Sequence, residues 1–208
     1  MPMENFFRIR AEKQSHIVNA AFMIFGRQRY RKASLSDIAQ EAGITKGMIT
    51  YYFGSKKTLY MYLIEVSQTM LAKAASERMA NRNIDFFERL RLVTEVNMSA
   101  IKEHPALISF TNSLYNETDP EVAEDIAKRV ALAEYPRIDF FMDGADVSRF
   151  KDEYDPDMIC RFMVWALDGF MMELYENENI KTHAGMLAQK LYKCLDVMQE
   201  AFTEPLPQ

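Results

Sequence analysis

The chain has 208 residues, of which 49% are hydrophobic and 26% are charged, with a formal net charge of −5 at pH 7. This length and composition suit one long domain or two closely packed domains with a sizeable core. No stretch approaches the roughly 20 uninterrupted apolar residues of a membrane helix, and the first residues lack a signal peptide's apolar centre. We therefore expect a cytoplasmic protein with no membrane partner.

The charge is divided unevenly along the chain. Residues 1–57 hold ten Lys and Arg against four Asp and Glu, a net charge of +6, whereas residues 58–208 hold 15 against 26, a net charge of −11. A basic end on an otherwise acidic protein is what phosphate binding by that end requires. The charge distribution therefore favours nucleic acid as a partner of the N-terminal segment.

The first predicted helix has an apolar stripe that runs from Ile17 to Phe25 at helical spacing. Residues 1–8 give no firm structure, although Arg8, Arg10 and Lys13 are placed to lie along a phosphate backbone. The stripe itself predicts a core-facing helix.

Two short helices joined by a tight turn are predicted next. Ser34 precedes Asp37 by three residues and is placed to cap the first helix, which Gly43 can close in a left-handed conformation. Thr45 is placed to cap the second helix, in which Ile49 and Phe53 face inward. The side chains left to face outward are Lys46, Gly47, Met48, Thr50, Tyr51 and Tyr52.

This outward surface combines a cation, a bare backbone position, a hydroxyl group and two phenols. It suits a helix whose N-terminus lies in the major groove of DNA. Ser55 can cap the following helix, from which Lys56 and Lys57 would project toward phosphate. An ordinary helical hairpin with a lysine-rich end is the alternative, and the spacing favours a helix-turn-helix.

These residues resemble the TetR (tetracycline-repressor) family of bacterial transcriptional regulators. The matching positions are Ser34, Ile38 and Ala39, Ala42 and Gly43, Thr45, Lys46 and Gly47, the run Tyr51, Tyr52 and Phe53, and Lys56 before Leu59. The resemblance implies DNA contacts from Ser34, Ser36, Lys46, Gly47, Met48, Tyr51, Tyr52 and Lys56.

The chain departs from the family pattern at two positions. Thr50, which we include in the candidate DNA surface, stands where the family usually carries a tyrosine. Arg29 stands where a glycine usually closes the first helix. We therefore expect Arg29 either to adopt a strained left-handed conformation or to end the helix differently.

A long helix is expected from Ser55 to about Met79, linking a DNA-binding domain, residues 1–54, to a ligand-binding and dimerisation domain, residues 55–208. Capping and first-turn proline patterns predict the later helix starts. They lie at Asp85 with Glu88, at Pro105, at Asp119 with Pro120, and at Asp155 with Pro156. Pro136 is expected to kink or end the helix that follows Asp119.

The last two helices are predicted to form the dimer. The helix after Pro156 is apolar nearly all round, so it must be covered on both sides, and a second copy of the chain is the simplest cover. The family's dimers likewise resemble a four-helix bundle made from the last two helices of each subunit. The expected interface residues are Phe162, Trp165, Gly169, Leu187, Leu191, Leu195 and Met198.

The 15 Met and the aromatic residues suggest an adaptable apolar cavity in the second domain. The expected lining residues are Met70, Val93, Asn97, Phe110, Tyr115, Glu134, Trp165 and Gly169, with Asn97, Tyr115 and Glu134 as its polar groups. A small apolar or amphipathic effector would bind there, although its identity cannot be derived from the residues.

Catalytic and metal-binding patterns are not found. The three His are scattered, and there is no HExxH, GxSxG or glycine-rich phosphate loop. Cys160 and Cys194 have no CxxC spacing, so we expect reduced, buried thiols. No cofactor is expected.

The sequence thus predicts an all-α protein of about nine helices. The resemblance to the TetR family implies the function of a homodimeric repressor that a ligand releases from a pseudo-palindromic operator, and the residues themselves do not show the sign of regulation. An α-helical adaptor that binds protein instead of DNA, and a helical enzyme, remain as alternatives.

Overall fold

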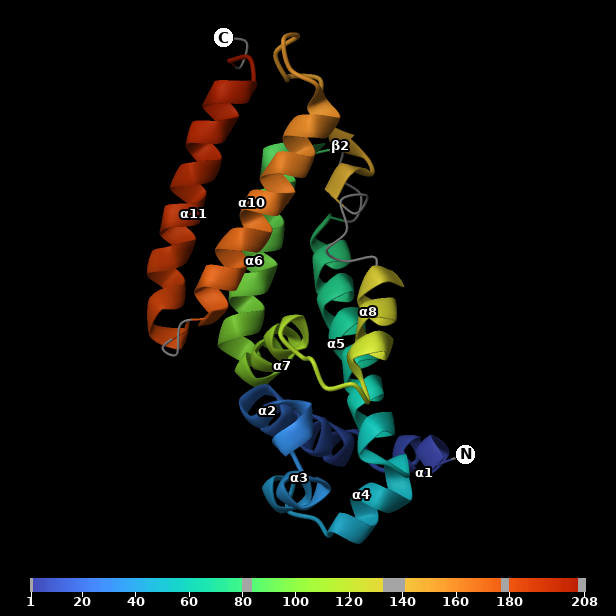
Figure 1. Cartoon of the computed structure of the whole chain (residues 1–208). Helices are drawn as coiled ribbons and strands as arrows, with labels where there is room; N and C mark the ends of the chain where they lie inside the picture. The colour runs from blue at the N-terminus through green and yellow to red at the C-terminus, as the bar shows by residue number, and fades with distance from the viewer. Residues whose placement is uncertain (1, 80–83, 133–140, 177–179, 206–208) are drawn as a thin grey trace. The chain divides into compact units, whose positions relative to one another are not determined.

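The computed structural model describes residues 2–79, 84–132, 141–176 and 180–205, which form ten helices and two short strands (Figure 1). The all-α prediction is confirmed. The strands β1 (Ile84–Asp85) and β2 (Ala145–Asp146) pair in parallel, with Ile84 opposite Ala145, and the sequence analysis did not predict them. Among the described helices, none is long and apolar enough to span a bilayer.

The chain divides into two compact units. The first comprises Met1–Thr69 and His104–Leu132, and the second comprises Met70–Glu103 and Ala133–Gln208. The long helix α5 (Lys56–Met79) starts in the first unit and continues into the second, as predicted. The functional boundary after residue 54 stays a prediction.

The first unit contains α1 (Pro2–Phe7), α2 (Ala11–Lys32), α3 (Leu35–Glu41), α4 (Lys46–Phe53), the start of α5, α7 (Pro105–Tyr115) and α8 (Ala123–Leu132). Helix α2 packs closely along α7 because Gly26 has no side chain: a Cβ there would lie 2.7 Å from Ser109 Oγ and 2.9 Å from the Phe110 nitrogen. This close approach places aromatic rings of α2, α5 and α7 in one core. Phe110 is one of them, fully buried, with its ring centroid 5.3 Å from that of Tyr60.

Helix α2 is interrupted at Arg29, where the backbone has φ 57° and ψ 174°. The first of the two expected outcomes is therefore confirmed: the residue takes a positive φ. The backbone N–H of Tyr30 donates a hydrogen bond to Glu117 Oε2 at 2.8 Å, and Arg29 Nη1 donates to the Asn116 carbonyl at 3.2 Å. The segment between α7 and α8 thus holds the interrupted end of α2.

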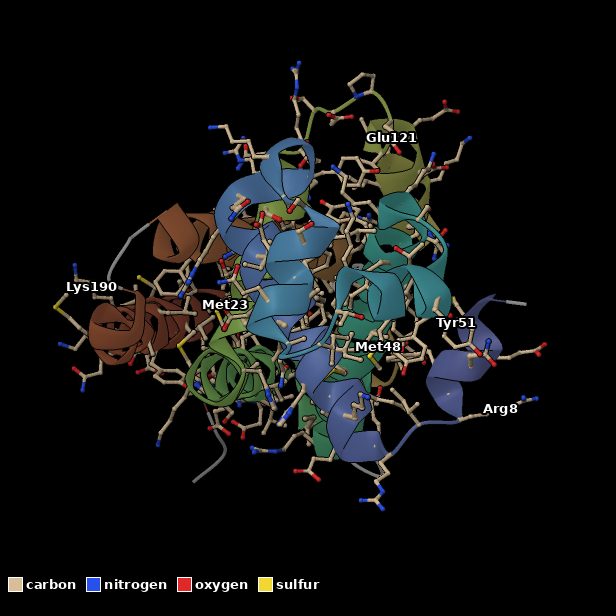
Figure 2. The ribbon with its side chains drawn as sticks, turned by 90° about the horizontal axis from the view of Figure 1, so that it is seen from below. Arg8, Met23, Met48, Tyr51, Glu121 and Lys190 are labelled. Atoms are coloured by element: carbon tan, nitrogen blue, oxygen red, sulfur yellow. The ribbon has the colours of Figure 1, made fainter. Side chains whose placement is uncertain are left out.

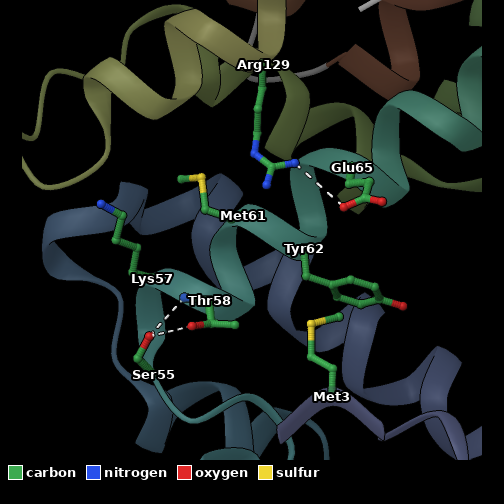
Figure 3. Close-up of a pocket in the computed structure, with 8 residues that line it drawn as sticks. All are labelled: Met3, Ser55, Lys57, Thr58, Met61, Tyr62, Glu65 and Arg129. Atoms are coloured by element: carbon green, nitrogen blue, oxygen red, sulfur yellow. Dashed lines mark hydrogen bonds and ion pairs between the residues drawn. The ribbon is translucent and has the colours of Figure 1, made fainter. Parts of the chain in front are cut away.

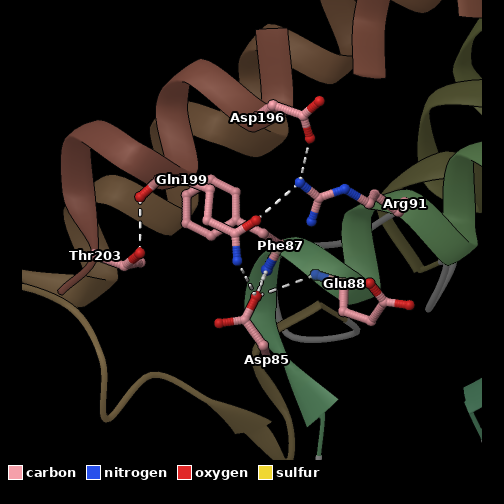
Figure 4. Close-up of polar contacts among 7 residues, drawn as sticks. All are labelled: Asp85, Phe87, Glu88, Arg91, Asp196, Gln199 and Thr203. Atoms are coloured by element: carbon pink, nitrogen blue, oxygen red, sulfur yellow. Dashed lines mark hydrogen bonds and ion pairs between the residues drawn. The ribbon is translucent and has the colours of Figure 1, made fainter. Parts of the chain in front are cut away.

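The second unit contains α6 (Phe86–Glu103), α10 (Pro156–Glu176) and α11 (Ile180–Phe202), with α11 packed along α6. Figure 4 shows the polar contacts that join α6 to α11. Asp85 Oδ1 caps α6 by accepting from the Phe87 and Glu88 amides, and it also accepts from Gln199 Nε2 at 3.3 Å. Arg91 donates to Gln199 Oε1 at 2.8 Å and to Asp196 Oδ1 at 2.6 Å.

The predicted helix starts are largely confirmed. Pro105 occupies the first turn of α7, and Asp155 Oδ1 accepts from the Asp157 amide at the start of α10. Asp119 Oδ1 accepts from the Glu121 amide, although the regular helix α8 begins only at Ala123. Pro136 lies outside the described residues.

The cysteine prediction is confirmed at one position and wrong at the other. Cys160 is buried, and burial raises the pKa of its thiol to about 12. Cys194 is exposed, because the opposite side of α11 is the one that packs on the protein core.

Candidate nucleic-acid interface

Capping side chains define both helices of the predicted helix-turn-helix. Ser34 Oγ accepts from the Asp37 amide at 3.1 Å, and Thr45 Oγ1 accepts from the Met48 amide at 3.3 Å. Each bond satisfies one backbone donor that a helix start leaves free. The predicted N-caps of α3 and α4 are therefore confirmed.

The turn between α3 and α4 follows from Gly43, which has φ 65°. Its amide donates to the Gln40 carbonyl at 3.2 Å, and the Ile44 amide donates to the Ala39 carbonyl at 2.9 Å. This bonding pattern closes a helix through a left-handed residue, a conformation that costs glycine little. The angle at which α4 leaves α3 is thus built into the local sequence.

Helix α4 presents an exposed surface at its N-terminal end. Lys46, Gly47, Thr50 and Tyr51 are exposed, whereas Ile49 and Phe53 are fully buried. Tyr51 retains 62% of its accessible surface, and Figure 2 shows it near Met48 on the face viewed from the α3–α4 end. Ser36 on α3 is also exposed. A dipolar helix end with a hydroxyl group, a phenol and a cation can bind phosphates and reach base edges.

Tyr52 does not belong to this surface, so the prediction that it faces outward is wrong. It is only 5% exposed, and its ring lies 6.1 Å from that of Phe6 on α1. It shares the buried face of α4 with Ile49 and Phe53, three and one residues away, because positions i, i+3 and i+4 of a helix lie on one side. The spacing alone placed Tyr52 next to the inward-facing positions, but the ring that covers it belongs to Phe6, which is distant in the sequence.

Lys56 has a structural role that its position in the sequence did not indicate. Its Nζ donates to the carbonyls of Tyr30 and Ala33 at 3.0 and 3.2 Å and lies 4.2 Å from the centre of the Tyr30 ring. It thereby satisfies carbonyl groups at the end of α2. An ammonium group has three donors, so one remains for a phosphate, and the DNA contact of Lys56 stays a prediction.

A shallow cavity of about 320 Å³ lies beside the start of α5 (Figure 3). Its cationic side chains already have acidic partners: Lys57 lies 2.7 Å from Asp125, and Arg129 lies 3.7 Å from Glu65. Ser55, also at its edge, caps α5 as predicted by accepting from the Thr58 amide at 3.0 Å. We assign no ligand to this cavity.

The residues predicted to line an effector cavity are divided between the two units, and the cavity stays a prediction. Phe110 belongs to the aromatic core of the first unit, and Tyr115 is 61% exposed. Met70, Trp165 and Gly169 are exposed in the second unit, and Glu134 lies outside the described residues. Val93 and Asn97 are both buried on α6, as the prediction required.

The predicted dimer residues divide between the two last helices. On α10, Phe162, Trp165 and Gly169 are exposed, with 48% and 69% of the surface of the two aromatic residues accessible. On α11, Leu191 and Leu195 are buried within the protomer, so their assignment to an intersubunit seam is wrong. Met198 is half-buried, and the side chain of Leu187 is outside the described set.

Comparisons with known proteins agree with this fold. Residues 17–63 match the family model described as bacterial regulatory proteins, tetR family. The HTH-type transcriptional regulator AcrR of Shigella flexneri is 32% identical over 69 residues, which are 33% of this chain and 32% of that protein. The match thus spans about a third of the length of this relative.

Solved structures resemble the chain over most of its length. A TetR family transcriptional regulator from Chloroflexus aurantiacus has a TM-score of 0.68 and 21% identity, over 99% of this chain and 100% of that chain. The fatty acid degradation regulator FadR from Bacillus halodurans has a TM-score of 0.64 and 19% identity, over 85% and 96%. At these identities the likeness is one of fold.

Proposed function

Because the chain belongs to the TetR family of bacterial regulatory proteins, we propose that it is a homodimeric transcriptional repressor that binds a pseudo-palindromic operator in the cytoplasm. The proposal rests on the exposed N-terminal end of α4. Thr45 caps this end of the helix, and the buried Ile49 and Phe53 attach the opposite face of α4 to the core. We assign the DNA contacts to Ser36, Lys46, Gly47, Met48, Thr50, Tyr51 and the remaining donor of Lys56. Ser34 contributes as the cap of α3.

The dimer forms through the outer face of α10. Met158, Phe162 and Trp165 are exposed large apolar side chains on this helix, and their spacing places them on one side together with Gly169. Exposed apolar surface of this kind marks an interaction site. A twofold-symmetric contact uses the same patch on both copies, so one face on each protomer is sufficient.

Dimerisation sets the distance between the two copies of α4, the proposed recognition helix. Two recognition helices enter successive major grooves when they are held about 34–36 Å apart, one turn of DNA. An effector that binds the second unit releases the operator if it prefers the protomer arrangement in which this spacing is lost. We assign the binding of a small apolar or amphipathic effector to the side of α6 on which the buried Val93 and Asn97 lie, with Asn97 as the polar group.

The test starts from the full-length protein and a pool of random duplexes, from which bound DNA is selected and sequenced. Tyr51→Ala is compared with Tyr115→Ala, which removes an equally exposed tyrosine from the end of α7. We expect an inverted-repeat consensus, affinity that falls steeply with salt, and loss of affinity only for Tyr51→Ala. No enrichment of any sequence, or binding that is insensitive to salt, would reject DNA recognition in favour of a protein-binding adaptor.

A further inference from the structure

Helix α1 packs directly on α4, the proposed recognition helix, although the sequence pattern predicted no structure over residues 1–8. Phe6 is fully buried. Its ring centroid lies 4.7 Å from that of Phe53 on α4 and 5.6 Å from that of Tyr62 on α5. Phe6 therefore fills the joint at which α4 passes into α5, and it covers the Tyr52 ring of α4 as well.

The segment that links α1 to α2 is also fixed at its α2 end. Gln14 Nε2, on the first turns of α2, donates to the Ile9 carbonyl at 2.9 Å, and the Ile9 amide donates to the Phe6 carbonyl at 3.4 Å. Arg8 lies between these two fixed points. Its backbone position is thus determined by α4 on one side and α2 on the other.

Arg8 is exposed at the end of this braced segment. In Figure 2 its side chain extends from the end of α1 on the side of the molecule where Tyr51 is found. Arg10, two residues on, is exposed as well. Arginine binds phosphate through two parallel hydrogen bonds, and a backbone that is already fixed loses less freedom on binding.

We propose that residues 2–10 form a second DNA-contacting element, in which Phe6 attaches α1 to the recognition helix and Arg8 binds a backbone phosphate beside the site of Tyr51. The proposal rests on the DNA binding proposed above. Because α1 is joined to α4 itself, the phosphate contact also limits how far α4 can turn in the groove. The element therefore acts on both affinity and the choice of sequence.

Duplex DNA fits this surface better than an acidic protein does. Helix α1 packs on α4 itself, and the segment that contains both carries a net charge of +6 over residues 1–57. A regular row of phosphates is the partner that a segment of this net charge matches.

The experiment uses the full-length protein and the duplex selected from the random pool, with Arg8→Gln beside Lys128→Gln. The control removes one positive charge from an exposed lysine of α8 in the same unit. Each lost phosphate contact reduces the slope of log affinity against log salt by about 0.9, so two protomers lose about 1.8. When the salt is raised from 50 to 200 mM, the fold loss of affinity should be roughly ten times smaller for Arg8→Gln than for the parent. Lys128→Gln should show the same fold loss as the parent.

Ethylation interference then locates the contact. One phosphate in each half-site should weaken binding of the parent when ethylated and should have no effect on Arg8→Gln. Phe6→Ala should lower the ratio of affinities for selected and unrelated DNA, and Phe6→Leu should restore most of it. This rescue separates attachment of α1 from a general loss of folding.

The outcomes separate the two proposals. If the parent selects no duplex, DNA binding itself fails. If the parent binds its selected duplex but Arg8→Gln and Lys128→Gln share its salt slope and its interference pattern, the second contact element is refuted and the proposed function stands.

Discussion

Replacing Arg29 by glycine should make the protein more stable than replacing it by alanine. Arg29 has φ 57° and ψ 174°, a region that is essentially restricted to glycine and costs other residues about 1–3 kcal/mol. Both variants lose the exposed hydrogen bond from Arg29 to Asn116, so that loss cancels in the comparison. The greater conformational freedom of glycine in the unfolded chain reduces its advantage in the free energy of unfolding by about 0.5–1 kcal/mol. The remaining advantage of Arg29→Gly over Arg29→Ala is about 1 kcal/mol.

A matched pair at Arg27 supplies the control. This residue is exposed in the regular part of the same helix, where glycine is less favourable than alanine by about 1 kcal/mol. The sign of the difference should therefore reverse between the two positions. Urea denaturation at one protomer concentration measures it, and thermal melting should show a shift of about 2–4 °C at each position. If alanine is the more stable residue at both positions, the backbone at Arg29 is not strained and the reasoning is refuted.

Three further outcomes follow from the described contacts. Tyr52→Ala should lower the free energy of unfolding by about 2–4 kcal/mol because its ring is buried, while Tyr51→Ala should change it by less than about 0.5 kcal/mol; equal urea midpoints would contradict this. The hydrogen bond from Lys57 holds the pKa of Asp125 below its ordinary value. The pair therefore stabilises the protein at pH values above the ordinary pKa of Asp, and this stabilisation is lost as the pH falls through the lowered pKa. NMR titration should show a higher pKa of Asp125 in Lys57→Met, and an unchanged pKa would exclude the pairing. Trp165→Lys should shift the protein toward monomers in sedimentation at micromolar concentration without unfolding it, since the side chain is 69% exposed; a dimer of parental affinity would place the interface elsewhere.

Features encoded within four or five residues could be predicted from the sequence. Ser34, Thr45 and Asp155 each cap a helix through an amide two or three residues further along, and Gly43 closes α3 with bonds to neighbours on the same turn. A local pattern is sufficient for these features because both partners lie inside it. The helix-turn-helix and most helix starts were accessible for that reason.

Features that depend on distant partners were not accessible in the same way. Tyr52 is buried because Phe6 covers it, and Lys56 turns toward Tyr30 because α2 ends beside the start of α5. Phenol and ammonium groups suit a DNA surface equally well in the sequence alone. Only the packing of α1 and α2 decides which of them remain exposed, so the local pattern predicted an exposed surface on α4 but included a buried residue in it.

The last two helices show the same limit in the predicted dimer. The residue pattern of α10 is apolar nearly all round, so periodicity alone cannot say which side faces the core. Burial decides it: Ile159, Met163 and Leu167 pack inside the protomer, whereas Phe162 and Trp165 do not. On α11 the leucines at 191 and 195 are used inside, which leaves Met186, Cys194 and Val197 exposed. A bundle built with α11 would use exposed side chains such as these three, because a seam through the leucines would require the protomer core to open first.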